Sequence, residues 1–181
     1  MTIEEKISDY ISVLKKYNET TNVYSKSAYD KLDFHIENCR LLGFHMKQKG
    51  PIFDFGSGSG LPSVILSIIK PNTRIFAIDS TLKKATFLKH VKSELNLENL
   101  TVVHQDVLTF LRTEKTRPRY ITAKAFAPLP KILNICEKIK FKGQELWVPI
   151  SKNQKLEIQE MNLQGSCFVE TNSHIFLKYL L

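Results

Sequence analysis

The sequence predicts an α/β protein with a Rossmann-like fold, in which a mainly parallel sheet carries helices on both faces. Short apolar runs typical of buried strands alternate with helical stretches along the chain. A glycine-rich segment lies where the first such strand passes into a helix. The chain has 181 residues, of which 43% are hydrophobic, and this suffices for a complete core. We expect a single domain over residues 1–181, with N-terminal helices over 1–49 and a Rossmann-like core over 50–181.

Two helices are expected before the first strand, where they form an N-terminal helical cap on one side of the core. The first has apolar side chains three and four residues apart, from Ile3 to Tyr17. A polar turn from Asn18 to Asn22 separates it from a second helix, which runs from about Ser27 to Met46.

The next segment is a strand-to-helix turn that reads Asp54-Phe55-Gly56-Ser57-Gly58-Ser59-Gly60. A strand begins at Pro51, and a helical stretch follows from Leu61 to Ile69. Glycines let the backbone turn tightly and approach a ligand, and the free amides of the next helix point at it. A dinucleotide-binding turn requires its third glycine where Leu61 stands. The D-x-G-x-G-x-G pattern instead resembles motif I of the class I methyltransferases that bind S-adenosylmethionine.

A second acidic residue supports a nucleoside ligand. Asp79 ends the strand Arg74-Ile75-Phe76-Ala77-Ile78-Asp79, 25 residues after Asp54. In a right-handed βαβ unit, the first two strands end side by side at the carboxyl edge of the sheet. A carboxylate there accepts both hydroxyl protons of a ribose. The alternative is a helix cap before residues 81–84, a purpose that Ser80 or Thr81 serves equally well.

The remaining elements continue the alternation. Strands are expected at 100–103, 120–123 and 144–150, and helices at 82–95, 107–111, 129–139 and 154–161. Residues 167–169 and 175–181 form a closing pair of strands.

Composition narrows the class of protein. No apolar run approaches the roughly 18 residues of a membrane span, and no signal peptide is visible. The three scattered cysteines fit free thiols in a reducing, cytoplasmic setting. The histidines lack metal-ligand spacing, so no metal is expected. Nothing indicates an obligate dimer, and we expect a monomer.

The net charge of +8 is concentrated in one segment. Residues 112–142 carry nine basic side chains and two acidic ones. Such an excess of basic side chains is typical of a protein that binds a phosphate-bearing partner such as a nucleic acid. Lysine outnumbers arginine 21 to 5, so a lysine-rich genome is the alternative source of the high pI, although it would not concentrate the charge.

Several blocks together resemble the ribosomal RNA small subunit methyltransferase G family, also called glucose-inhibited division protein B. The similarity runs from about Tyr10 to Lys152. It is carried by the blocks Asp79-Ser80-Thr81-Leu82-Lys83-Lys84-Ala85-Thr86-Phe87-Leu88 and Ala123-Lys124-Ala125-Phe126-Ala127, and in weakened form by Asn22-Val23-Tyr24 and Phe34-His35-Ile36-Glu37-Asn38-Cys39. The resemblance implies a class I methyltransferase fold and methylation of N7 of one guanosine in 16S rRNA, with the small ribosomal subunit as partner.

The resemblance also implies which residues bind S-adenosylmethionine. The family's contacts fall on the residues Gly56, Gly58, Leu61, Asp79, Val107 and Leu108. Asp106 either accepts a hydrogen bond from the adenine amine or caps the following helix. The family's arginine falls on Lys124, beside the methyl-transfer position, so Lys124 is implied as catalytic and cofactor-binding. A lysine there keeps the charge but loses the planar fork of arginine, and from the residues alone it is equally a solvated charge.

Guanine N7 carries a free lone pair, so the chemistry requires alignment and no general base. Phe126 either stacks on a splayed base or belongs to the core, and His35 either touches the ligands or is structural.

Besides Lys124, the chain departs from the family pattern at four further positions: Ser63 replaces a glycine, Phe34 an arginine, Asn38 an aspartate and Asn153 a glycine. Two alternatives therefore stay open: a methyltransferase acting on another RNA or a small molecule, and a non-enzymatic RNA-binding or assembly protein on this fold.

Overall fold

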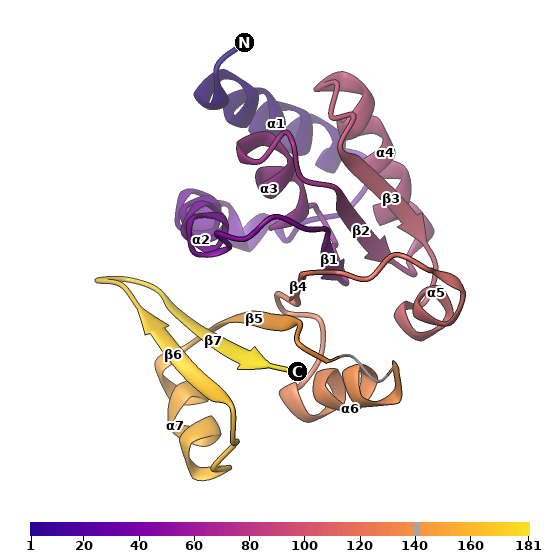
Figure 1. Ribbon diagram of the computed structural model, residues 1–181. Coiled ribbons are helices and arrows are strands. Elements are labelled where there is room, and N and C mark those ends of the chain that lie inside the picture. Colours follow the sequence, from indigo (N-terminus) through magenta and orange to yellow (C-terminus); the bar gives the residue numbers. More distant parts are fainter. Residues whose placement is uncertain (140–141) are drawn as a thin grey trace.

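The computed structural model describes residues 1–139 and 142–181, and in these ranges seven strands form one sheet in the order β3-β2-β1-β4-β5-β7-β6 (Figure 1). The strands are β1 (Ile52–Phe55), β2 (Ile75–Asp79), β3 (Leu100–His104), β4 (Tyr120–Thr122), β5 (Glu145–Ile150), β6 (Ser166–Glu170) and β7 (Ile175–Leu180). The first five pair in parallel, whereas β7 is antiparallel to both β5 and β6. The α/β prediction with a mainly parallel sheet is confirmed.

Helices cover both faces of the sheet, as expected (Figure 1). One face carries α1 (Ile3–Asn18), α2 (Leu32–His45), α3 (Ser63–Ile69) and α4 (Leu82–Glu94). The other carries α5 (Val107–Thr113), α6 (Leu129–Ile139) and α7 (Lys152–Glu160). Each layer has its own apolar cluster, because alternate side chains of a strand point to opposite faces. The central parallel strands β1, β2 and β4 are buried on both faces, and in β1 even Asp54 is only 1% exposed.

The N-terminal cap differs from the expectation at the start of its second helix. The chain forms a 3₁₀ helix, η1 (Lys26–Lys31), before α2 begins at Leu32. The buried side chain of Asn18 holds the preceding loop, since its Oδ1 accepts from the backbone nitrogens of Val23 and Tyr24 and its Nδ2 donates to the carbonyl of Tyr24. The tighter 3₁₀ turn closes this loop, and regular α-helix starts only after it.

Two other helices also begin at a residue that differs from the expected one. The helix after the glycine turn begins at Ser63 instead of Leu61, because Gly60 has a φ of +94° and the turn extends through Pro62. The helix expected from Gln154 begins at Lys152, because Ser151 caps it and exchanges hydrogen bonds with Gln154 in a capping box.

The basic segment 112–142 does not form one surface. Arg119 lies at the amino end of β4, where its guanidinium donates to Glu145 and to the carbonyl of Gly143. Lys124 follows the opposite, carboxyl end of the same strand, and Lys131 lies on α6. Lys140 is outside the described residues. The concentration of charge in the sequence therefore does not correspond to a single patch.

Among the described residues, no helix is long and apolar enough to cross a membrane. The described part of the chain also contains no cluster of three or more histidine, cysteine or acidic side chains arranged to hold a metal ion. Cys39, Cys136 and Cys167 are free thiols.

Candidate cofactor and acceptor site

The glycine turn is tied to the end of the neighbouring strand. β1 and β2 pair in parallel, so the turn after Phe55 lies beside Ile78 and Asp79. The backbone nitrogens of Gly56 and Ser57 donate to the carbonyl of Ile78 at 2.8 and 3.0 Å. The backbone nitrogen of Gly58 donates to Oδ2 of Asp79 at 2.9 Å. The glycine turn and the predicted ribose-binding residue Asp79 are therefore in direct contact.

Gly56 is required both by its backbone and by the space around it. Its φ is +68°, a region that other residues rarely adopt. A Cβ at this position would lie 2.4 Å from Cδ2 of Phe126. Phe126 thus packs against the glycine turn and against Phe55, with ring centroids 6.2 Å apart. Of its two sequence-based interpretations, this packing favours the core role, although the side chain also borders the cavity described next.

A cavity of about 220 Å³ opens between the glycine turn, the end of β2 and the start of α5. It brings together four of the predicted residues: Gly56, Asp79, Asp106 and Val107. Phe126, the candidate for base stacking, also lines it, as do five neighbours that were not predicted: Ile78, Ser80, Thr81, Lys84 and Ala125. Gly58 contributes through its hydrogen bond to Asp79, whereas Leu61 is packed in the core cluster. Leu108 is not among the lining residues.

The two aspartates that border the cavity also have local structural partners. Oδ1 of Asp79 accepts from the nitrogen of Thr81 at 2.8 Å, and Lys84 lies 3.9 Å from Oδ2. Asp106 caps α5, with Oδ1 accepting from the nitrogens of Leu108 and Thr109. Capping and ligand binding are compatible, because a carboxylate has about four acceptor positions.

Asp54, which was not predicted as a site residue, is the most unusual group in this region. It is buried, and neither carboxylate oxygen has a hydrogen-bond partner among the described residues. Burial raises the pKa of Asp54 to about 6, an effect partly offset by the nearby polar groups of Ser57 and Ser63, which do not reach hydrogen-bond geometry with the carboxylate, and by the charge of Lys124. An acidic residue at the head of the glycine turn was the available signal. A buried acceptor without a partner fits a ligand that carries a donor or a cation.

A second, larger cleft of about 720 Å³ adjoins the first cavity. It lies between the start of α2, the residues after β4, the start of α7 and the turn of the β6–β7 hairpin. His35, Asn38, Lys124 and Lys152 are among the residues that line it. Ala125 lines both cavities and has a φ of +52°. Backbone strain of this kind in a residue other than glycine is concentrated at functional sites.

The cleft places Lys124 close to buried groups of the other elements. Its charge contributes to lowering the pKa of His35 to about 4, mainly a consequence of burial, with smaller contributions from Lys31 and His174. His35 is therefore a neutral imidazole at neutral pH. The same charge acts on Asp54. Lys124 thus lines the larger cleft, and its charge acts on the buried carboxylate of Asp54 and on His35.

These features fit S-adenosylmethionine. The glycine turn gives a ligand close access to the backbone, and Asp79, which lines the smaller cavity, offers acceptors for ribose hydroxyls. An adjoining cleft leaves room for a methyl acceptor. The fold and the site together define a class I methyltransferase.

Solved structures agree in fold, among them a methyltransferase from Geobacter sulfurreducens (TM-score 0.67, 13% identity, 96% of this chain and 88% of that one) and a SAM-dependent O-methyltransferase from Thermotoga maritima (TM-score 0.58, 13% identity, 80% and 65%).

Sequence comparison places the chain within this class. The model of the GidB family, rRNA small subunit methyltransferase G, matches residues 3–180. Proteins named ribosomal RNA small subunit methyltransferase G are 32% identical in Brachyspira hyodysenteriae (89% of this chain, 78% of the relative) and 30% identical in Campylobacter jejuni (92% and 91%). The chain belongs to the rRNA small subunit methyltransferase G family, an S-adenosylmethionine-dependent class of enzymes, and the family resemblance seen in the sequence is confirmed.

Proposed function

We propose that this protein transfers a methyl group from S-adenosylmethionine to N7 of a specific guanosine in 16S rRNA. The observation that carries the proposal is the junction of the two cavities at Ala125, next to Lys124. A methyl donor whose nucleoside occupies the smaller cavity can present its methyl group to a base in the larger cleft. Membership of the rRNA methyltransferase family supports ribosomal RNA as the acceptor.

The residues of the cleft suit an acceptor that needs no deprotonation. When bound, S-adenosylmethionine supplies an electrophilic methyl group on its sulfonium sulfur, and N7 of guanine has a lone pair available at neutral pH. His35 is neutral there, so it adds no positive charge beside a base that becomes cationic on methylation. Positioning and exclusion of water are then the main contributions of the protein, and well-oriented reactants gain roughly 7–11 kcal/mol in this way.

We assign separate roles to the charged residues. Asp79 holds the ribose, Asp54 accepts from the ammonium group of the methionine part, and Val107 and Asp106 face the adenine. Lys124 is the catalytic residue, because it contacts the methyl acceptor. Its ammonium donates to O6 of guanine, and this selects against adenine, which carries an amino donor at the corresponding position. Gly56 and Gly58 shape the turn, and Leu61 supports it from the core.

The test is transfer from methyl-labelled S-adenosylmethionine to small ribosomal subunits that lack native modifications, followed by mapping of the label on 16S rRNA. Label on a single guanine N7 is expected from the wild type and not from Asp79→Ala. Lys124→Ala should reduce turnover at least about tenfold, a loss of about 1.4 kcal/mol or more, while Lys124→Arg retains it. Cofactor binding without transfer would instead favour another RNA or a small molecule as acceptor. RNA binding without measurable cofactor affinity would favour an assembly protein.

A further inference from the structure

The larger cleft has an aromatic wall that the transfer reaction described above does not use. Phe34, at the start of α2, and His174, at the start of β7, both line it. Their rings are stacked, with centroids 4.2 Å apart and an interplanar angle of 18°. His174 is buried, at 4% exposure, whereas Phe34 is 47% exposed. One face of the phenyl ring is covered by the imidazole of His174, and the ring of His35 makes an edge contact with it at 5.8 Å between centroids, so the exposed surface is the part of the ring that these two histidines leave open.

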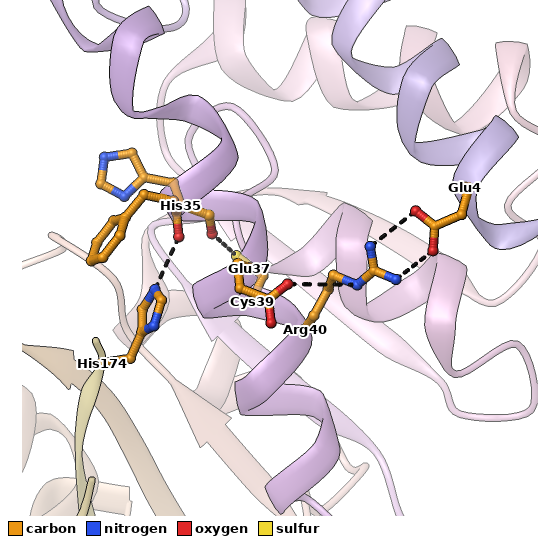
Figure 2. Close-up of polar contacts among 7 residues, drawn as sticks. Glu4, His35, Glu37, Cys39, Arg40 and His174 are labelled. Carbon is orange, nitrogen blue, oxygen red and sulfur yellow. Dashed lines mark hydrogen bonds and ion pairs between the residues drawn. The ribbon is translucent and has the colours of Figure 1, made fainter. Parts of the chain in front are cut away.

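His174 holds this wall in place through contacts on several sides. Its Nε2 lies 3.1 Å from the carbonyl oxygen of Phe34, and its Nδ1 lies 2.8 Å from the hydroxyl of Ser173. Its backbone nitrogen donates to Oγ1 of Thr171 at 3.1 Å. Figure 2 shows the labelled imidazole of His174 directed at the first turn of α2, beside His35. The phenyl ring is therefore supported by a bond between the N-terminal cap and the C-terminal hairpin, 140 residues apart.

The surroundings of Phe34 are those of a nucleic-acid site. Lys124 and Lys152 line the same cleft, and neither has an ion-pair partner within residues 1–139 and 142–181. The charge of Glu170, an acidic residue that also lines it, is offset by Lys155 at 2.6 Å. A half-exposed aromatic ring that shares a cleft with unpaired cations matches an RNA strand, whose phosphates need cations and whose unpaired bases stack on aromatic rings.

We propose that the exposed face of Phe34 stacks on an unpaired RNA base adjacent to the guanine that accepts the methyl group. The proposal rests on the proposed function for the identity of the RNA. The stacked base is a neighbour and not the acceptor, because the acceptor must meet the methyl donor at Ala125, and Phe34 does not line the smaller cavity. Stacking needs only the face of a base, so this contact adds affinity and register without selecting a sequence.

The experiment measures two quantities for each variant: KM and kcat for methyl transfer to undermethylated small subunits, and affinity for a fluorescein-labelled single-stranded RNA oligonucleotide at fixed salt. Phe34→Ala removes the ring, Phe34→Leu keeps an apolar contact with His174 without an aromatic face, and Phe34→Trp enlarges the face. Phe44→Ala is the matched control, since Phe44 is on the same helix and 69% exposed but is not among the residues that line the cleft.

We expect Phe34→Ala and Phe34→Leu to weaken RNA binding roughly 5- to 150-fold, the range measured for loss of base stacking, and to raise KM with little change in kcat. Phe34→Trp should bind at least as tightly as the wild type, and Phe44→Ala should match it. Wild-type affinity in Phe34→Leu, with an unchanged melting temperature, would overturn the proposal, as would an equal loss in Phe44→Ala. If the wild type transfers no methyl group to rRNA, the proposed function fails by itself, and the oligonucleotide series still decides whether Phe34 stacks on RNA.

Discussion

The carboxylate of Asp79 accepts a hydrogen bond from the backbone nitrogen of Gly58, at a distance of 2.9 Å. This contact joins the end of β2 to the turn after β1. It orients the carboxylate at the edge of the smaller cavity and at the same time holds the turn in its left-handed conformation, with a φ of +57° at Gly58. One side chain thus has a structural and a proposed ligand-binding task.

Replacement of Asp79 should separate these tasks. Asp79→Ala removes both the ribose acceptor and the partner of Gly58, so cofactor affinity should fall more than tenfold and the melting temperature should also fall. Asp79→Asn keeps an oxygen acceptor for one amide and should lose affinity with a smaller loss of stability. Calorimetric titration with S-adenosylhomocysteine and thermal denaturation give the two numbers, and unchanged affinity in both variants would remove Asp79 from the site.

Asp54 should make stability depend on pH in an unusual direction. Its folded pKa of about 6 is above the ordinary value, so the folded protein holds this proton more tightly than the unfolded chain. The contribution of Asp54 to stability is then largest below about pH 4 and is lost as the pH rises toward 6. Asp54→Asn should remove this dependence, gain on the order of 2 kcal/mol at pH 8, and bind S-adenosylhomocysteine more weakly.

Urea denaturation of the wild type and Asp54→Asn across pH 4 to 8 measures this effect. Asp9→Asn, an exposed position on α1, is the control and should leave the pH profile unchanged. A loss of stability at pH 8 in Asp54→Asn would show that the buried carboxylate is stabilised by partners in the folded protein.

Two glycines with similar backbone angles allow steric and conformational costs to be separated. Gly56 and Gly143 have φ values of +68° and +77°, but a Cβ at Gly143 would meet no atom within 4 Å. Gly143→Ala should therefore cost about 1–2 kcal/mol for the left-handed backbone alone. Gly56→Ala should cost about 1–3 kcal/mol more, because Phe126 must move. Equal losses of stability in the two variants would mean that the Phe126 side chain moves aside without any loss of folding free energy.

His35 should titrate far below an ordinary histidine. Burial and the charge of Lys124 lower its pKa to about 4, so the folded protein binds this proton less tightly than the unfolded chain. The stability it contributes is present above about pH 6.5 and is lost as the pH falls toward 4. Imidazole titration followed by NMR, with His35→Gln to assign the resonance, checks the value. A midpoint above pH 7 would place a cation beside the acceptor base at neutral pH and contradict the role given to the neutral ring.

Much of the fold could be predicted from the sequence, because local patterns determine it. Apolar runs at buried strands and spacings of three and four in helices follow from the periodicity of each element. The errors lie at helix starts such as Leu32, Ser63 and Lys152, where side-chain contacts and turn geometry decide which residue takes the first helical conformation. The nucleic-acid partner that the basic segment indicates agrees with the rRNA methyltransferase family, but the sequence did not show that β4 places Arg119 and Lys124 at its two opposite ends.

The sequence by itself determined the class of the protein, because the glycine turn and the acidic residue that follows it are short patterns tied to parallel strand ends. Only the tertiary structure decided the acceptor side. The stack of Phe34 on His174 and the cleft that Lys124 shares with His35 bring together α2, the end of β4 and the start of β7. Contacts between elements so distant in sequence follow from how the layers pack, and no periodicity or local spacing encodes them.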